Sequence, residues 1–301
     1  MDWIVKTQNL SKQIKKRPII SNVNMRIKKG EIYGLLGPNG AGKTTIMKLL
    51  LNLIHADQGS IEIFGEMLTP NSVDMFKRIS AIIEYPIFYE KLTAQENLFL
   101  HCSYMGYYNV EEIETVLRIT GLTDIKNKKV KEFSLGMKQR LGIARAILTK
   151  PELMILDEPI NGLDPLGISE IRSLLKKMNQ EYGISIMISS HILNEIEQMA
   201  DTIGVIKEGH LIEEVAMEKI KESAEEFLEI KVNDARKASY ILSEKFAFKN
   251  FKTLDEKTIR IYEKVIGHND FLTRLMSEDL VIESLTTRQR AFCQVPFYVY
   301  E

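Results

Sequence analysis

The chain has 301 residues, of which 45% are hydrophobic and 27% charged, and this balance excludes a disordered or fibrous protein. Its formal net charge of -1 lacks the basic excess of most nucleic-acid-binding proteins, so we expect no nucleic acid as a partner. Cys102 and Cys293 form no CxxC pair, and no apolar run approaches the ~20 residues that span a bilayer, which argues against a disulfide framework, a zinc site and a membrane span.

Short apolar runs alternate with amphipathic helical segments over the first two thirds of the chain, and this alternation predicts a parallel sheet wrapped by helices. Three runs are predicted to be buried strands: residues 32–36, 153–156 and 184–188. A mostly helical segment, residues 93–149, separates the first two strands. It opens with Thr93 and Glu96 at the spacing of a capping box, in which each side chain satisfies an exposed amide of the other residue.

The pattern changes after Gly209 to that of a smaller α+β unit. We predict six elements in the order strand, helix, strand, strand, helix, strand over residues 227–232, 235–246, 247–254, 258–262, 269–277 and 280–284. This order is typical of a ferredoxin-like domain. We therefore expect a large domain over residues 1–215 and a small C-terminal accessory domain over residues 216–301, with no element assigned to residues 288–301.

A glycine-rich segment follows the first predicted strand and precedes a predicted helix over residues 44–51. Its sequence matches the phosphate-binding loop: Gly37-Pro38-Asn39-Gly40-Ala41-Gly42-Lys43-Thr44, with Thr45 after it. Backbone amides of such a loop and the N-terminus of the helix attract phosphate oxygens. We expect Lys43 to reach the β and γ phosphates of a nucleotide and the Thr44 hydroxyl to bind Mg²⁺.

Two adjacent carboxylates follow the predicted strand at residues 153–156. Because neighbouring side chains of a strand diverge, Asp157 fits a ligand of Mg²⁺ and Glu158 fits the group that polarises an attacking water. An acidic pair after a strand is also common as a helix cap or a surface charge. The presence of Lys43 in a phosphate-binding loop favours nucleotide hydrolysis over these alternatives.

Ser134 precedes a strong helical pattern and has two interpretations. As an N-cap it would satisfy a free amide at the start of the helix. Its hydroxyl, together with the free amides of the helix, would also suit a second phosphate site. The residues alone favour the cap.

These motifs, in this order, resemble the ATPase cassette of ATP-binding cassette (ABC) transporters over the large predicted domain. Residues 37–44 resemble the Walker A motif, and residues 153–158 resemble the Walker B motif with its catalytic glutamate. The sequence FSLGM at residues 133–137 lies where the family signature is found. Residues 161–164 resemble the D-loop, and His191 resembles the switch histidine that contacts the γ-phosphate.

The resemblance implies an α/β P-loop fold with a parallel-sheet core and a helical subdomain, and ATP and Mg²⁺ as cofactors. It also implies a second cassette, identical or closely paralogous, that closes on the first head to tail. Each ATP then lies between Lys43 of one cassette and three residues of the other, namely Ser134, Gly136 and Asp164. The closing and reopening of the two cassettes would be passed to separate transmembrane permease subunits through the helical segment and residues 84–89. The resemblance therefore also implies a location at the cytoplasmic face of a bacterial membrane.

Three positions depart from the common family pattern. Glu84 stands where a glutamine is usual, and FSLGM replaces LSGGQ. Both features resemble the subgroup that exports bacitracin, lantibiotics and similar peptide antibiotics, and Glu84 would add a carboxylate to the Mg²⁺ site. Ile14 lies where many members have an aromatic residue that stacks on adenine, so an apolar contact with the base is expected instead.

The sequence therefore predicts the ATP-hydrolysing subunit of a peptide-antibiotic exporter. Non-transport ABC proteins that act on ribosomes or DNA are one alternative, but they resemble tandem cassettes or a cassette split by a long coiled coil, and this chain has neither pattern. A regulatory switch that binds ATP without turnover is a second alternative, against which Glu158 and His191 argue.

Overall fold

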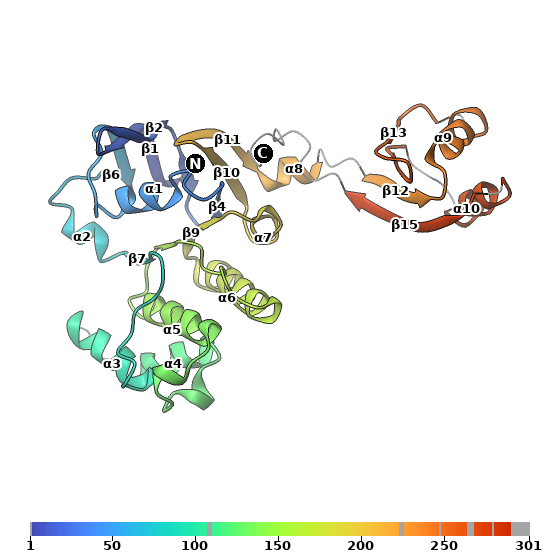
Figure 1. Ribbon diagram of the computed structural model, residues 1–301. Helices are drawn as coiled ribbons and strands as arrows, with labels where there is room; N and C mark the ends of the chain where they lie inside the picture. Colours follow the sequence, from blue (N-terminus) through green and yellow to red (C-terminus); the bar gives the residue numbers. More distant parts are fainter. Residues whose placement is uncertain are drawn as a thin grey trace. The chain divides into compact units, whose positions relative to one another are not determined.

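The computed structural model describes residues 2–106, 110–222, 226–246, 248–263, 268–278 and 280–289. These residues fall into two units, the first ending at Met217 and the second beginning at Glu218 (Figure 1). Each unit contains a hydrophobic cluster of buried residues. Within the described ranges, no helix is both long enough and apolar enough to cross a bilayer.

Six strands form a largely parallel sheet at the centre of the first unit, in the order β11-β10-β4-β9-β8-β7. They are β4 (Ile32–Leu36), β7 (Ile79–Ile82), β8 (Leu153–Leu156), β9 (Ser185–Ser190), β10 (Thr202–Lys207) and β11 (His210–Ala216). Neighbours from β10 to β7 pair in parallel, and β11 pairs antiparallel with β10 at the edge. Every residue of β4, β8 and β9 is buried, as parallel strands usually are. The predicted parallel sheet is confirmed.

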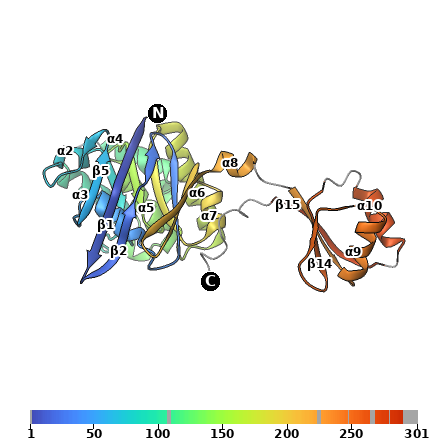
Figure 2. The ribbon, with the colours of Figure 1, turned by 90° about the horizontal axis from the view of Figure 1, so that it is seen from above.

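The first unit also contains an antiparallel sheet that the sequence did not lead us to expect. Its strands are β1 (Trp3–Ile14), β2 (Arg17–Val23), β3 (Arg26–Lys28), β5 (Gln58–Ile63) and β6 (Glu66–Met67). Their order is β2-β1-β5-β6, with β3 also paired to β1, and Figure 2 shows β1, β2 and β5 side by side. The turn between β1 and β2 consists of Lys15 and Lys16, whose φ angles of 50° and 64° lie in the left-handed region. Because glycine or asparagine usually occupies such turns, two lysines give no hairpin signal, and the expectation of a parallel sheet alone was incomplete.

The helices α3, α4 and α5 pack together and form the helical part of the first unit (Figure 1). They span Ala94–Tyr104, Val110–Ile119 and Leu135–Ile147, and single 3₁₀ turns at Thr123–Ile125 and Val130–Glu132 precede α5. The predicted capping box is confirmed, because the Thr93 N–H donates to Glu96 Oε2 (2.7 Å) and the Glu96 N–H donates to Thr93 Oγ1 (3.2 Å). α5 packs against β7 and α6, which joins the helical part to the central sheet. The other helices of the unit are α1 (Lys43–Leu50), α2 (Val73–Phe76), α6 (Pro165–Tyr182) and α7 (Leu193–Glu197), and α8 (Met217–Glu222) follows them.

The second unit has the predicted order of elements. They are β12 (Glu226–Val232), α9 (Ala235–Glu244), β13 (Phe251–Thr253), β14 (Thr258–Ile261), α10 (His268–Met276) and β15 (Ile282–Gln289). The sheet order is β13-β14-β12-β15, and all neighbours are antiparallel. This is the arrangement of a ferredoxin-like unit, as the sequence predicted.

Two strands of this unit differ from their predicted bounds by more than one residue. The strand predicted at residues 247–254 is shorter, because the Phe248 N–H donates to the carbonyl of Leu242 in α9 and the Asn250 N–H donates to Glu263 Oε1. Position 247 itself lies outside the described residues. The strand predicted at residues 280–284 begins later and extends to Gln289, so β15 includes residues 285–289, to which no element was assigned. Residues 290–301 lie outside the described part of the chain.

Replacing Phe271 of α10 with alanine tests whether the second unit has an independent core. Phe271 is 3% exposed, and its ring centre lies 5.1 Å from that of Phe246 and 6.1 Å from that of Phe248. Removing a buried phenylalanine side chain typically costs about 3 to 5 kcal/mol. We expect Phe271→Ala to lower the free energy of unfolding of the second unit by that amount, measured by hydrogen exchange of its amides.

The amides of α1 and β8 in the first unit should keep their wild-type exchange rates in this variant. The control is Tyr240→Ala in α9, which removes a ring that is 66% exposed and should change stability by less than about 0.5 kcal/mol. Faster exchange in both units of Phe271→Ala would contradict independent cores.

Candidate functional site

The phosphate-binding loop connects the end of β4 to the start of α1, and glycine is required at two of its positions. A Cβ on Gly37 would lie 2.3 Å from the carbonyl oxygen of Ile206, and a Cβ on Gly42 would lie 2.5 Å from Ile20 Cδ1. Gly42 also has a φ of 110° and provides no side-chain cap for α1. The first amides of α1 are therefore left for an anion, as the sequence predicted for this loop.

The other predicted residues of the loop lie around this helix terminus. Ala41, Gly42 and Lys43 are buried, whereas Asn39 and Gly40 are exposed. Three residues are half-buried: Pro38, Thr44 and Thr45. The loop therefore has an exposed tip and a buried base.

Lys43 is buried and makes three contacts within the site. Its Nζ donates to the carbonyl oxygens of Gly37 (2.7 Å) and Pro38 (3.2 Å). It also lies 3.1 Å from Glu158 Oε1 in an ion pair. The structure thus places the cation of the phosphate-binding loop against the second predicted carboxylate.

Asp157 ties three elements of the first unit together. Its Oδ2 accepts a hydrogen bond from Thr44 Oγ1 in α1 (2.6 Å), and its Oδ1 accepts one from Ser189 Oγ in β9 (2.7 Å). The side chain is buried, and no cation contacts it within the described residues. Ser189 also accepts the Glu158 N–H (2.8 Å), so it holds both carboxylate residues. Sequence analysis did not assign a role to Ser189, although its position at the end of a buried strand beside β8 was a usable signal.

These oxygen atoms fit a magnesium site. Thr44 and Asp157 supply a hydroxyl and a carboxylate, which are the hard ligands that Mg²⁺ prefers. The described residues contain no group of three or more His, Cys, Asp or Glu side chains that would enclose a metal ion. A sparse donor set suits Mg²⁺, which keeps several waters and binds phosphate oxygens.

Glu158 is held between two nitrogen atoms. Oε1 faces Lys43 Nζ as described, and Oε2 lies 3.0 Å from His191 Nδ1. Its φ of 48° is in the left-handed region, which is unfavourable for glutamate and marks a position held by its surroundings. The structure therefore brings Lys43, Glu158 and His191 together, as the sequence motifs predicted.

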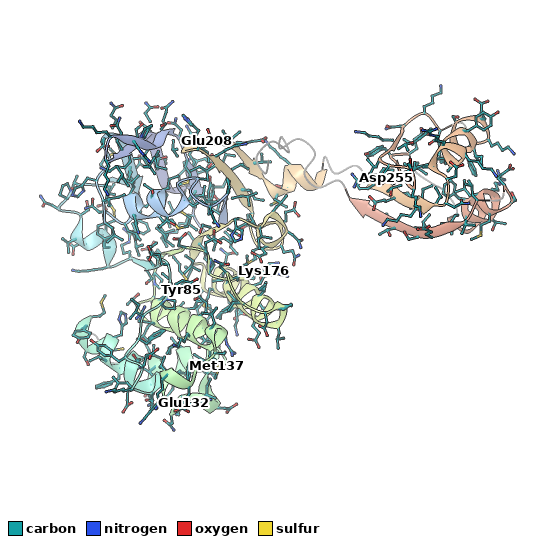
Figure 3. The ribbon with its side chains drawn as sticks, viewed as in Figure 1. Tyr85, Glu132, Met137, Lys176, Glu208 and Asp255 are labelled. Atoms are coloured by element: carbon teal, nitrogen blue, oxygen red, sulfur yellow. The ribbon has the colours of Figure 1, made fainter. Side chains whose placement is uncertain are left out.

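The signature and D-loop residues form a separate cluster. Ser134 caps α5 by accepting the Met137 N–H (3.2 Å), which confirms the predicted N-cap, and Figure 3 shows Met137 in the helical part. Asp164 caps α6 by accepting the Gly167 N–H (2.9 Å). Both residues, with Gly136, line a cavity of about 520 Å³. No residue of the phosphate-binding loop lines this cavity, so one chain does not bring the two clusters together.

Glu84 does not contact the predicted magnesium ligands among the described residues. It follows β7 with a φ of 65°, and its Oε1 lies 3.1 Å from Lys48 Nζ of α1 in an ion pair. Its carboxylate is therefore next to α1 but paired with a lysine. The sequence does not reveal Lys48 as the partner of Glu84, because the two residues are far apart in the chain.

Ile14 is 44% exposed at the end of β1, beside the hairpin turn. The partner strand β2 contributes Ile20, whose side chain contacts the phosphate-binding loop at Gly42. Ile14 thus lies on the same hairpin as Ile20, and its predicted contact with the nucleobase stays a prediction.

Comparisons with known proteins agree with this geometry. The family model described as ABC transporter matches residues 20–161. The chain is 53% identical to the uncharacterized ABC transporter ATP-binding protein YcbN of Bacillus subtilis (strain 168), over 96% of this chain and 94% of that protein. It is 46% identical to the bacitracin transport ATP-binding protein BcrA of Enterococcus faecalis, over 87% of this chain and 85% of that protein.

Among solved structures, cbiO1 of Clostridium perfringens, part of the ABC transporter complex cbiONQ, is similar with a TM-score of 0.69 and 27% identity. The match covers 74% of this chain and 92% of that one. The phosphate-binding loop and the two carboxylates after β8 thus have one common explanation. The chain belongs to the ATP-binding proteins of ABC transporters, and it is the ATPase subunit of such a transporter.

Proposed function

We propose that this subunit hydrolyses Mg²⁺-bound ATP with Glu158 as the group that polarises the attacking water. The observation that supports this role is the position of Glu158, with its two oxygens facing Lys43 and His191. Lys43 and His191 bind the terminal phosphates in this proposal, and Thr44 and Asp157 hold Mg²⁺. Mg²⁺ would neutralise charge that develops on the phosphate oxygens.

Lys43 must change partners when a nucleotide is bound. Without phosphate, its Nζ is satisfied by two carbonyl oxygens and by Glu158. When Lys43 turns to phosphate oxygens, it leaves Glu158 Oε1 without its counter-ion, and this carboxylate oxygen becomes free to accept a proton from water. Binding of the substrate and activation of the base are therefore coupled through one ammonium group.

Changing Glu158 to glutamine tests its role. An amide preserves the size of the side chain but cannot act as a base, and loss of a general base typically lowers the rate by ~10² to 10⁴. We expect Glu158→Gln to bind ATP and to lose steady-state phosphate release by that factor. The control is Glu62→Gln, which breaks a surface ion pair with Lys6 and should hydrolyse ATP at the wild-type rate. Near-normal turnover in Glu158→Gln would remove Glu158 from this role.

A complete ATP site requires two chains in our proposal. Ser134, Gly136 and Asp164 line a cavity that excludes the phosphate-binding loop of their own chain. They would act on ATP held by Lys43 of a second cassette, as ABC cassettes dimerise head to tail. The partner is either an identical chain or a close paralogue.

Mixing two inactive variants tests this arrangement. Lys43→Ala removes the proposed contact of the lysine with the phosphates. Ser134→Arg places a bulky side chain where Ser134 is proposed to meet the ATP of the other chain. Random exchange makes about half of the dimers mixed, and each mixed dimer has one complete site of two, so occluded ATP should recover to about a quarter of the wild-type amount. Either variant alone should occlude none. The matched control mixes Lys43→Ala with the double variant Lys43→Ala, Ser134→Arg, and any recovery in this control would contradict sites shared between chains.

The helical part offers a surface for separate permease subunits. In the segment after β7, Tyr85 is 62% exposed and Ile87 is 83% exposed. Tyr85 is labelled in Figure 3. Next to this segment lies a cavity of about 400 Å³, lined by residues of the segment and of α3 with Arg145 of α5. Aromatic and arginine side chains are typical of interfaces. We infer that transmembrane permease chains dock here and place the subunit at the cytoplasmic face of a bacterial membrane.

Peptide antibiotics of the bacitracin and lantibiotic class are the proposed cargo. The identity to a bacitracin transport ATP-binding protein supports this, and so does Glu84 in place of the usual glutamine. Action on ribosomes or DNA, or a switch without turnover, has no comparable support in the described residues.

Deleting the gene in its host tests the cargo. We expect the deletion to lower the inhibitory concentration of bacitracin or a lantibiotic severalfold, and the wild-type gene on a plasmid to restore it. Glu158→Gln should not restore it. Sensitivity to an antibiotic that enters the cell and acts on ribosomes should stay constant. Unchanged sensitivity to every peptide antibiotic tested would exclude this cargo while leaving the ATPase assignment intact.

A further inference from the structure

Lys48 is a charged residue beside the ATP site that the proposed reaction does not use. It lies on α1 four positions after Thr44, so the two side chains share one face of the helix. Its Nζ lies 3.1 Å from Glu84 Oε1, and this pair is a side-chain contact between α1 and the segment that follows β7. The lysine side chain is 34% exposed and that of Glu84 is 66% exposed.

The segment after β7 is fixed at its far end by hydrogen bonds to the helical part. The Tyr89 N–H donates to Asn97 Oδ1 (2.9 Å), and Arg145 Nη1 donates to the carbonyl oxygen of Ile87 (2.8 Å). At its near end, Glu84 has a backbone φ of 65°, which a glutamate adopts only when its surroundings hold it there. Lys48 supplies a side-chain contact at this near end.

The charges of the neighbouring carboxylates favour a cationic partner for Glu84. Asp157 and Glu158 already place two carboxylates directly after β8, and Glu84, which follows the neighbouring strand β7, adds a third that repels them when no Mg²⁺ is bound. Lys48 neutralises Glu84 one helical turn away from Thr44. An exposed ion pair of this kind is weak, so a hard divalent cation can displace it.

We propose that Lys48 is a positioning residue, which holds Glu84 against α1 while the nucleotide site is empty and releases it when Mg²⁺·ATP is bound. The contact between Lys48 and Glu84 in the nucleotide-free chain is independent of the proposed function. The release of Glu84 on binding of Mg²⁺·ATP rests on the proposed function. In the nucleotide-free chain, Lys48 thereby fixes the start of the segment that is proposed to dock the permease.

Hydrogen exchange of residues 83–88 in the nucleotide-free, full-length chain tests the resting contact. We expect Lys48→Met to speed the exchange of these amides about two- to fivefold, in line with the loss of an exposed ion pair, and Lys48→Arg to leave it near the wild-type rate. Glu84→Gln should speed exchange as Lys48→Met does, and adding Lys48→Met to Glu84→Gln should produce no further change. Lys77→Met, which breaks the exposed pair with Asp74, is the matched control and should not affect this segment.

The release is tested in the Glu158→Gln background with saturating Mg²⁺ and ATP, where turnover is blocked. Adding Lys48→Met to this background should no longer change the exchange of residues 83–88, because Glu84 no longer depends on the lysine. Equal exchange of the nucleotide-free wild-type and Lys48→Met chains would overturn the proposal, and so would an effect of Lys48→Met that persists in Glu84→Gln. Failure of Glu158→Gln to bind ATP would count against the proposed function instead, while the nucleotide-free comparison would still decide the role of Lys48.

Discussion

The rest of the site depends on the hydrogen bonds made by Asp157. Its carboxylate is buried at the end of β8, yet two hydroxyl groups, from Thr44 and Ser189, satisfy its oxygens. The backbone N–H of Asp157 donates to the carbonyl oxygen of Ile82 in β7 (2.9 Å). One residue thus connects β7, β9 and α1. A buried carboxylate without such donors would be costly, and its loss would loosen the alignment of these three elements at once.

Neutral donors around Asp157 also have an electrostatic consequence. A lysine or arginine would cancel the charge of this carboxylate, whereas hydroxyl groups leave it in place. The cation of the site, Lys43, pairs with Glu158 instead. The two adjacent acids are therefore kept in different states, one available to a metal ion and the other masked by a lysine.

The parts of the site that could be predicted from sequence are those in which local chemistry decides the structure. The glycines at 37 and 42, the caps at Thr93 and Ser134, and the acids after β8 each have a requirement that a few neighbouring residues reveal. The parts that could not be predicted depend on partners distant in the chain. The Lys48–Glu84 pair joins residues 36 positions apart.

The antiparallel sheet of the first unit escaped prediction for a related reason. Its first hairpin turns at two lysines, which are not residues that usually favour such a turn. In addition, β1 pairs with β5, which lies far from it in the sequence. The ferredoxin-like order of the second unit was predictable, because alternating strands and amphipathic helices follow each other closely there. Its strand ends were not, since side-chain acceptors such as Glu263 decide where β13 begins.

The cap at Ser134 has a consequence for how a signature serine can serve both its own helix and a nucleotide. A hydroxyl accepts hydrogen bonds through its lone pairs and donates one through its proton. The Met137 N–H occupies a lone pair and fixes the oxygen, which leaves the proton to point outward. Capping and the proposed phosphate binding would therefore use opposite ends of the same group. Asp164 caps α6 with a carboxylate, which has no proton to give, so in the proposed shared site it would accept hydrogen bonds from donor groups rather than bind a phosphate oxygen.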